Sequence, residues 1–376
     1  MEVTQCARTV PFFSYPQVFL SEREELAAIF QDVGSRGAFI LQRDTEQFER
    51  NLARYVGAKH VVSMSNATDA LHLAIRAADI GPGDEVVFSS HTMVATAAAI
   101  HFAGATPVPC ECGPDHLIDP ASAEAAISPH TRAIMPTQLN GRTADMDELQ
   151  RIADNHSLLI IEDAAQALGS RFRGKSAGTF GLAGAVSFYP AKTLGCLGDG
   201  GCVIIDDDAI YEKLLLLRDH GRNAAGEVVM WGLNCRLDNL QAAILDHKLK
   251  SYDQAIARRR AVARQYQRRL SHLEQLRLPP PPCDNGDHFD IFQNYEIEAE
   301  QRDALRVFLE ERGIGTLVQW GGKAVHQFEE LGFSQKLPFT DELFSRILML
   351  PMNTFVDDSD VAYVCDAIEK FYRENG

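Results

Sequence analysis

Apolar runs of strand length alternate with segments of helical periodicity along this chain from about residue 44 onward. The apolar runs lie at residues 61–63, 85–88, 106–108, 133–135, 158–161, 183–188 and 202–205. Helical patterns separate the earlier runs, at residues 45–52, 70–75, 93–103 and 145–155. Strands that are apolar on both faces and connected by helices are typical of a parallel sheet that is covered on both sides. The pattern therefore predicts an α/β fold with a mostly parallel central sheet sandwiched by helices.

The length and the later pattern predict two domains. A chain of 376 residues suits a large domain and a smaller one. One long helix is expected from Leu237 to about Leu273, and the proline run at 279–282 then predicts a linker or an extended crossover. We expect a large domain over residues 1–250 and a small α+β domain over residues 251–376, which includes this linking helix. The small domain is expected to contain helices near 301–312 and 358–372 and a strand at 315–318.

Three successive arginines lie on the predicted linking helix, namely Arg258, Arg259 and Arg260. Such a cluster can mark a phosphate site, but a charge run on a helix more often forms a solvated face. We therefore expect these side chains in solvent.

Charge and cysteine content restrict the class of protein. Lys and Arg minus Asp and Glu give 36 − 52 = −16, which argues against binding to nucleic acid or to anionic membranes. The apolar run at 10–13 is too short for an export signal, and the segment 93–104 is too short to span a membrane. The eight cysteines are scattered, and the close pair Cys110 and Cys112 lacks further metal ligands at matching spacing. We expect a cytoplasmic protein with reduced thiols and no metal.

Two polar clusters follow apolar runs, where a parallel sheet places its ligands. In the first, residues 65–69, the backbone N–H groups of a helix start and the Thr68 hydroxyl can bind an anion, although a plain helix cap explains the same residues. The second contains Glu162, Asp163 and, three positions after Asp163, Gln166. A carboxylate there is well placed to meet a ligand, and a capping acid is the alternative.

The third cluster, residues 187–201, places Lys192 in a glycine-rich loop between two apolar runs. Tyr189 and Pro190 can exclude water from the lysine, and a desolvated lysine becomes an amine nucleophile that condenses with carbonyls. A nucleotide P-loop is excluded because the glycines follow the lysine, and no Gly-x-Gly-x-x-Gly stretch supports a dinucleotide enzyme. Together, an anion cradle, the carboxylate of Asp163 and Lys192 match the phosphate, ring nitrogen and aldehyde of pyridoxal 5′-phosphate.

The chain resembles the DegT/DnrJ/StrS family of pyridoxal-phosphate-dependent sugar aminotransferases, which have the fold of the aspartate aminotransferase superfamily (fold type I). The stretches that carry the resemblance are 66–71, 81–86, 94–96, 161–166, 187–201, 219–221, 234–238 and 241–243. They recur in order over about residues 20–370, which is nearly the whole chain. The lysine stretch with its trailing glycines is the most specific of them.

The resemblance implies roles for individual residues. Lys192 would bind the cofactor aldehyde and shuttle a proton, and Asp163 would pair with the ring nitrogen. Gln166 would lie beside the ring hydroxyl. The implied phosphate contacts are Ala67, Thr68 and Ser187, together with Asn234 from a neighbouring subunit, which implies a homodimer with shared active sites. From the residues alone, Asn234 can instead be a helix cap.

Two stretches depart from the family pattern. Where relatives carry an aromatic residue over the cofactor ring, this chain has Met93, and either its thioether or the ring of His91 can cover the cofactor. Late in the chain, His326 is retained without the tyrosine and proline that usually precede it. His326, His91 and Tyr189 are the candidate substrate contacts, and a packing role is the alternative for His326.

By this resemblance the protein is expected to move an amino group from an amino acid, with glutamate as the implied donor, to a keto group of a nucleotide-linked deoxy sugar. Relatives of the same fold that act on cyclitols, and a non-catalytic regulatory relative, are the alternatives. The sugar dehydratases among the relatives carry histidine in place of the lysine, so Lys192 argues against that activity.

Overall fold

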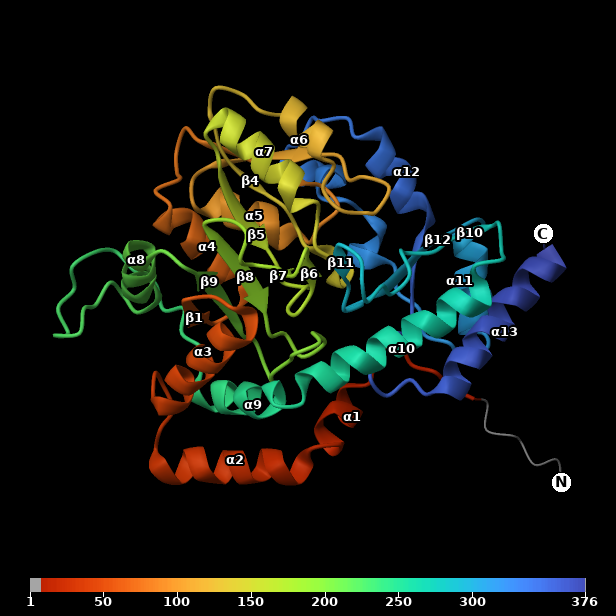
Figure 1. Cartoon of the computed structure of the whole chain (residues 1–376), viewed down its shortest axis with the longest axis horizontal. Helices are drawn as coiled ribbons and strands as arrows, with labels where there is room; N and C mark the ends of the chain where they lie inside the picture. Colours follow the sequence, from red (N-terminus) through yellow and green to blue (C-terminus); the bar gives the residue numbers. More distant parts are fainter. Residues whose placement is uncertain (1–7, 376) are drawn as a thin grey trace.

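The computed structural model describes residues 8–375, and a seven-stranded sheet lies at its centre (Figure 1). The strand order is β1-β9-β8-β5-β4-β2-β3. Strand β9 runs antiparallel to β1 and β8, and the remaining neighbours are parallel. The strands are β1 His60–Met64, β2 Glu85–Ser89, β3 Thr106–Cys110, β4 Thr131–Met135, β5 Leu159–Asp163, β8 Ala183–Ser187 and β9 Gly201–Ile205. The predicted mostly parallel α/β sheet is therefore confirmed.

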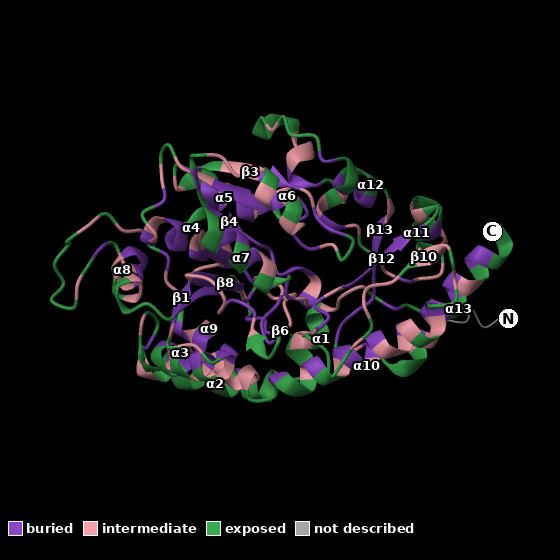
Figure 2. Ribbon diagram, turned by 45° about the horizontal axis from the view of Figure 1, so that its top comes forward, coloured by how far each residue is buried: buried purple, intermediate pink, exposed green. Residues whose placement is uncertain are grey.

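Helices cover both faces of this sheet because neighbouring residues of a strand point to opposite sides. Val62 of β1 packs in one cluster with Leu71 of α4, whereas the adjacent Val61 packs in another with Phe48 of α3. Figure 2 shows the buried strands between helices whose outer sides are exposed. The helices of this part are α1 Tyr15–Leu20, α2 Arg23–Arg36, α3 Arg43–Val56, α4 Ala67–Ala77, α5 Val94–Phe102, α6 Pro120–Ala125, α7 Met146–His156, α8 Asp208–Arg218 and α9 Asn239–Leu249.

The C-terminal part has a second core around an antiparallel sheet in the order β10-β12-β13. Its strands and helices are α10 Tyr252–Leu270, β10 Leu276–Arg277, β12 Tyr295–Ala299, α11 Arg302–Glu310, α12 Pro338–Arg346, β13 Ile347–Leu350 and α13 Asp358–Asn375. Val10 from the start of the described chain joins this core and bridges to Ile314. The domain boundary between residues 250 and 251 stays a prediction.

The proline run 279–282 lies between two sheets. It follows β10 and precedes β11 (His288–Phe289), which pairs with β6 (Arg171–Phe172). Strand β6 also pairs with β7 (Lys175–Ser176). The run is therefore an extended crossover from the C-terminal sheet to this small sheet.

The prediction of a single helix from Leu237 to about Leu273 is wrong, because α9 ends at Leu249 and α10 begins at Tyr252. Ser251, just before α10, has φ −110° and ψ 9°, which takes the backbone out of the helix. The apolar spacing continues through the break, so periodicity did not reveal it. Helix α10 is shared by both cores: Tyr252 packs with the large sheet and Val262 with the C-terminal sheet.

The prediction that Arg258–Arg260 lie in solvent is also wrong for two of the three side chains, those of Arg259 and Arg260. Arg259 and Arg260 are each only 3% exposed. The Arg259 guanidinium donates to the backbone carbonyls of Phe292, Gln293 and Met352, and Arg260 donates to that of Asp290. These arginines hold α10 against irregular chain whose carbonyls have no ladder partner.

The strand expected at 315–318 does not form. Leu317 makes an isolated bridge to Met349, and the strand of this region is β13 itself. Within residues 8–375, no helix combines the length and apolar composition needed to cross a membrane. The cysteines that the structure describes are free thiols, and Cys6 lies outside the described residues.

Candidate active site

A pocket of about 260 Å³ opens at the carboxyl ends of β1, β5 and β8, the edge where a parallel sheet presents its loops. Residues from all three predicted clusters line it. These are Ala67, Thr68, Asp163, Gln166, Ser187, Tyr189 and Lys192, and Met93 lines the pocket as well. The fold thus brings together segments that lie more than a hundred residues apart in the sequence.

Asp163 is the last residue of β5 and is 4% exposed. Its Oδ2 accepts a hydrogen bond from the Thr96 hydroxyl at 2.7 Å, and its Oδ1 accepts the N–H of Ala165 at 3.1 Å. Burial raises the pKa of this carboxyl, and the two hydrogen bonds and the charge of Lys192 oppose that rise. Asp163 is therefore held in a fixed orientation, in an environment where a cationic partner would be favoured.

The Thr96 hydroxyl belongs to a short buried chain of hydroxyl groups. The Thr137 hydroxyl donates to Thr92 Oγ1 at 2.9 Å, and Thr92 and Thr96 are 2.7 Å apart through their hydroxyl oxygens. Because Thr96 gives its proton to Asp163, Thr92 donates to Thr96. The chain thus points three hydroxyl donors in series toward one carboxylate oxygen.

Lys192 lies in the loop between β8 and β9 and lines the pocket. Desolvation lowers the pKa of its amine to about 8, and the nearby charge of Asp163 opposes this. Neighbouring contacts fix the loop: the Thr193 N–H donates to Gln293 Oε1 at 2.8 Å, and the Lys192 N–H donates to the Tyr189 carbonyl. The lowered pKa raises the fraction of neutral amine near neutral pH, which allows Lys192 to act as a nucleophile and as a proton carrier.

The start of α4 forms another part of the pocket wall. Asn66 caps this helix, since its Oδ1 accepts the Asp69 N–H at 2.8 Å, so the cap that was the alternative for this cluster is present. A cap and an anion site are compatible, because the first N–H groups of a helix have no partner within it. Gly201 of β9 lies directly behind: a Cβ there would be 2.4 Å from the Asn66 carbonyl carbon and 2.6 Å from the Ala67 nitrogen. Only glycine permits this close approach of strand and helix start.

Gln166 is held by two neighbours on the pocket wall. Its Oε1 accepts the Asn140 backbone N–H at 3.0 Å and the Asn294 side-chain N–H at 3.2 Å. Asn294 belongs to the C-terminal part, so this contact joins the two parts of the chain beside the pocket.

The structure separates Met93 from His91. Met93 lines the pocket and is 52% exposed, whereas His91 is 1% exposed and packs edge-on against Trp320 and Phe344. His91 Nδ1 lies 3.1 Å from the His116 carbonyl oxygen. Of the two residues, only Met93 lines the pocket.

His326 and Asn234 also lie outside the pocket lining. His326 is bonded on both sides, with Nδ1 2.7 Å from Ser90 Oγ and Nε2 3.0 Å from Asp341 Oδ1. This matches the packing alternative. Asn234 is exposed, and it does not cap α9, whose N-cap is Asp238.

Glu162, next to Asp163, has a purely local use. It is fully buried and accepts the N–H groups of Gly178 at 2.8 Å and Phe180 at 2.6 Å, as well as the Gln138 side chain at 2.7 Å. Glu162 therefore braces a turn, and the two adjacent acids have different environments.

Sequence reasoning assigned no role to Thr92, Thr137, Asn140, Asn294 or Trp320. Thr92 and Thr137 do follow apolar runs, which is the signal that identified the other clusters. Asn294 and Trp320 come from the C-terminal part, and no local pattern connects them to this edge of the sheet.

Comparisons with known proteins agree with this geometry. The sequence profile of the DegT/DnrJ/EryC1/StrS aminotransferase family matches residues 20–369. A pleiotropic regulatory protein of Geobacillus stearothermophilus is 38% identical over 369 residues, covering 97% of this chain and 99% of that protein. The dTDP-3-amino-3,4,6-trideoxy-alpha-D-glucose transaminase of Streptomyces venezuelae is 38% identical over 367 residues, covering 96% of each. The crystal structure of S. venezuelae DesV in complex with a ketimine intermediate has a TM-score of 0.92 and 37% identity, covering 96% of this chain and 98% of that one.

Proposed function

Since the chain belongs to the DegT/DnrJ/EryC1/StrS aminotransferase family, we propose that its pocket holds pyridoxal 5′-phosphate and serves amino transfer to a keto sugar. The family and the enzyme class that the resemblance implies are confirmed, as is the fold. The observation that carries the cofactor proposal is that buried Asp163, desolvated Lys192 and the start of α4 all line one pocket.

Lys192 and Asp163 divide the chemistry between two ends of the cofactor. When bound, pyridoxal phosphate supplies an aldehyde for the amino group and an electron-poor ring that stabilises negative charge on the carbon that loses its proton. Lys192 Nζ would bind the aldehyde and then take and return that proton, which its pKa of about 8 suits at neutral pH. Asp163 would hold the protonated ring nitrogen, and its hydrogen bonds keep the carboxylate in place for this.

The phosphate would lie at the start of α4, held by the N–H groups of Ala67 and Thr68 and by the hydroxyls of Thr68 and Ser187. Gln166 would contact the ring hydroxyl, and Met93 would cover the ring face. These placements are proposals that rest on the shared pocket and on the family match.

The donor that we propose is glutamate, and the acceptor is the keto group of a nucleotide-linked deoxy sugar. The S. venezuelae relative named as a dTDP-aminosugar transaminase supports the acceptor class. Tyr189, which is 47% exposed at the pocket, is the remaining substrate candidate from the sequence. His91 and His326 are not proposed as substrate contacts, because neither lines the pocket.

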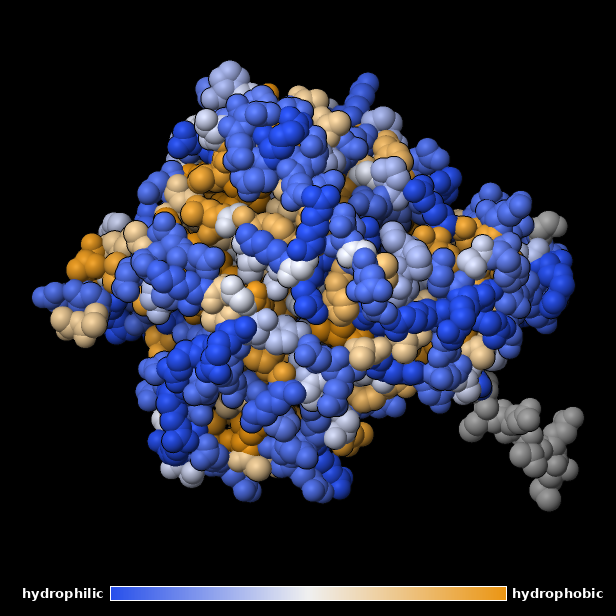
Figure 3. All heavy atoms as spheres, viewed as in Figure 1, coloured by the Kyte–Doolittle hydropathy of each residue, from blue (hydrophilic) through white to orange (hydrophobic). Residues whose placement is uncertain are grey.

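We also propose a homodimer in which Asn234 reaches the phosphate of the partner's pocket. The loop that follows α8 projects from the body of the protein in Figure 1, and Figure 3 shows hydrophobic side chains at the same edge. Its residues Val228, Val229 and Trp231 are 69%, 55% and 89% exposed. An exposed apolar loop of this kind is typical of a subunit interface.

The expected cytoplasmic location, and the absence of nucleic-acid and membrane partners, stay predictions.

The first experiment follows the cofactor. Purified protein should show an absorbance from lysine-bound pyridoxal phosphate, and borohydride reduction with peptide mapping should place the label on Lys192. Adding glutamate should remove that absorbance and release 2-oxoglutarate, and a keto sugar nucleotide should restore it. A label on another residue, or none, would refute the cofactor proposal.

The same assay separates the rival functions. Restoration by a cyclitol ketone but not by a sugar nucleotide would establish the cyclitol alternative. One relative is named as a regulatory protein; an absorbance that persists under every amino donor would favour a non-catalytic role of that kind.

The shared site is tested by complementation between subunits. Lys192→Ala and Asn234→Ala subunits should each form weakly active or inactive dimers. Mixed dimers keep one pocket with both residues intact, so they should recover about half of the native activity. Mixed dimers as inactive as their parents would contradict the shared site, and a monomer by light scattering would contradict the dimer.

A further inference from the structure

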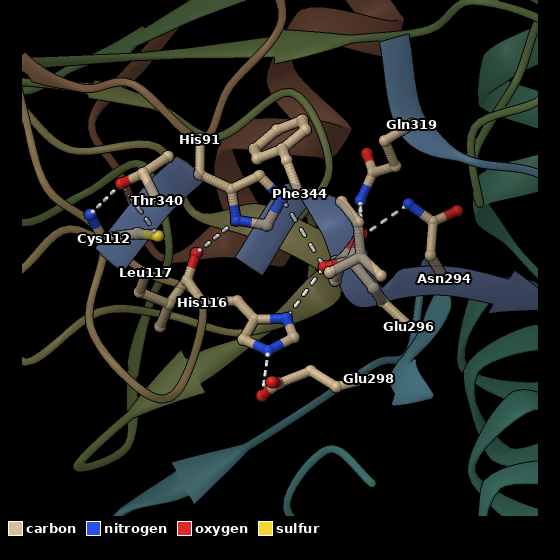
Figure 4. Close-up of polar contacts among 12 residues, drawn as sticks. His91, Cys112, His116, Leu117, Asn294, Glu296, Glu298, Gln319, Thr340 and Phe344 are labelled. Carbon is tan, nitrogen blue, oxygen red and sulfur yellow. Dashed lines mark hydrogen bonds and ion pairs between the residues drawn. The ribbon is translucent and has the colours of Figure 1, made fainter. Parts of the chain in front are cut away.

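A second cluster of chemistry-bearing side chains lies away from the proposed cofactor pocket, and nothing in the mechanism above uses it. His91 follows β2, His116 lies in the loop between β3 and α6, and Glu296 lies on β12. One side-chain nitrogen or oxygen from each lies within 4.8 Å of the others. Figure 4 shows that His91 and His116 each turn a ring nitrogen toward the same carboxylate oxygen of Glu296. The side chains of His91 and Glu296 are 0% and 1% exposed, and that of His116 is 12% exposed.

His91 presents an unpartnered nitrogen to this centre. Its Nδ1 lies 3.1 Å from the His116 carbonyl oxygen, which only accepts, so Nδ1 carries the proton and Nε2 has a free lone pair in the neutral ring. Within the described chain, Nε2 is buried and has no hydrogen-bond partner. It lies 3.6 Å from Glu296 Oε1. Two electron-rich atoms therefore face each other in a dry environment, an arrangement that a cation between them would satisfy.

The outer contacts hold each side chain in the orientation that a metal ligand needs. His116 Nδ1 donates to Glu296 Oε1 at 2.9 Å and would give up this proton when a cation binds, while its Nε2 donates to Glu298 Oε1 at 3.3 Å. Glu296 accepts the Gln319 side chain at Oε2, 2.6 Å, and the Asn140 side chain at Oε1, 3.0 Å. Metal-binding histidines typically donate their second nitrogen to a carboxylate or a backbone carbonyl, as His116 and His91 do here.

We infer that His91 Nε2, His116 Nδ1 and Glu296 Oε1 form a binding site for a borderline divalent cation, with Zn²⁺ as the best match. Two imidazoles and one carboxylate are a common zinc ligand set that leaves a fourth position for water, whereas Mg²⁺ and Ca²⁺ favour oxygen ligands. A cavity of about 40 Å³, enough for a water molecule, is lined by two of the three ligands, His116 and Glu296. The sequence predicted no metal, because these ligands come from three distant segments without a spacing motif.

The position of the site indicates what the ion would do. His91 and His116 belong to the part built on the large sheet, and Glu296 belongs to the C-terminal sheet. A bound ion would therefore tie the two parts together. Trp320, which packs against His91 at a ring distance of 5.5 Å, also lines the proposed cofactor pocket. The proposed ion site is thus separated from that pocket by one side chain.

The test uses the native, tag-free protein after dialysis against a chelator. Calorimetric titration with ZnCl₂ should give one Zn²⁺ per chain with micromolar or tighter affinity. Zn²⁺ should also raise the melting temperature. Co²⁺ as a substitute should give the visible d–d bands of a low-coordinate site with nitrogen ligands. Absence of tight stoichiometric binding to the native protein would overturn the inference, whatever the variants do.

Variants then locate the ion. Glu296→Gln and His116→Gln should each weaken Zn²⁺ binding by at least about 100-fold, and Glu298→Gln by roughly tenfold because it only supports His116. His156→Gln is the matched control, since His156 is a surface histidine beside a carboxylate, 3.4 Å from Glu124. Equal affinity in Glu296→Gln and native protein, or loss of the bound ion in His156→Gln, would place the ion elsewhere and refute this site. None of these readouts depends on pyridoxal phosphate, so the result is independent of the proposed function.

Discussion

The hydroxyl chain that ends on Asp163 can be cut at Thr96 while the carboxylate itself stays in place. Thr96→Val replaces the hydroxyl by a methyl group of similar size, so Asp163 loses its 2.7 Å hydrogen bond but keeps the N–H of Ala165. A hydrogen bond to a charged group contributes roughly 1.5–3 kcal/mol. Because Asp163 is only 4% exposed, water cannot easily replace the lost donor, and we expect about 2 kcal/mol.

At most that free energy should be lost from cofactor binding, because the bond forms both with and without the cofactor and only its strengthening on binding affects the affinity. Burial already raises the pKa of Asp163, and the Thr96 hydrogen bond opposes the rise. Without the bond, the ionised carboxylate that pairs with a ring nitrogen is less favoured. The upper limit of about 2 kcal/mol corresponds to roughly 30-fold weaker binding of pyridoxal phosphate. The dissociation constant is measured by titrating cofactor-free protein and following the absorbance of the lysine-bound form.

Two further variants keep this test specific. Thr96→Ser retains the hydroxyl and should bind the cofactor within about threefold of native protein, because the donor to Asp163 remains. Thr92→Val removes only the next donor in the chain and should have an effect between the two. If Thr96→Val binds pyridoxal phosphate as tightly as native protein, the reasoning that this hydroxyl supports the Asp163 carboxylate is refuted.

Three other predictions concern Lys192, α10 and the start of α4. Between pH 8 and 10.5, in cofactor-free protein, Lys192 is protonated in the unfolded state but largely neutral in the folded state. The free energy of unfolding of native protein, relative to that of Lys192→Met, should therefore rise over this pH range, by at most about 3 kcal/mol. Urea unfolding at both ends of the range measures this difference, and a constant difference would contradict the lowered pKa. Arg259→Met leaves three buried carbonyls without their donor and should lower the free energy of unfolding by about 2–4 kcal/mol, whereas Arg268→Met, on an exposed side chain, should change it by less than about 0.5 kcal/mol. Gly201→Ala places a Cβ 2.4 Å from the backbone at the start of α4 and should weaken cofactor binding about tenfold or more. The control Gly34→Ala, whose Cβ meets nothing within 4 Å, should leave cofactor binding unchanged. Equal affinities of the two variants would show that this helix start does not hold the phosphate.

Much of the fold and of the proposed site could be predicted because both follow from local rules. The strands of the large sheet are short apolar runs, and parallel strands carry their ligands at one edge, which is how Asp163 and Lys192 were identified. Met93 and His91 could not be separated in this way, since only the packing of Trp320 and Phe344 draws His91 away from the pocket.

The failures share a different cause. Arg259 is charged and lies in an arginine run, so the local sequence predicted a solvent-exposed side chain. In the structure it is buried because its guanidinium donates to backbone carbonyls that are distant in the sequence. The meeting of His91, His116 and Glu296 depends on how two sheets lie against each other, and no short pattern encodes that. Residues whose partners are far along the chain are therefore the ones that sequence reasoning missed.

Helix α10 has a consequence for how the molecule comes apart. The N-terminal end of this helix packs in the large core through Tyr252 and Ile256, and its C-terminal end packs in the C-terminal core through Val262 and Leu270. If either core unfolds, half of α10 loses its packing contacts, and a short helix without such contacts is only marginally stable in water. The chain should therefore denature as one cooperative unit, and neither half should survive as an autonomous fragment when the backbone is severed at Ser251.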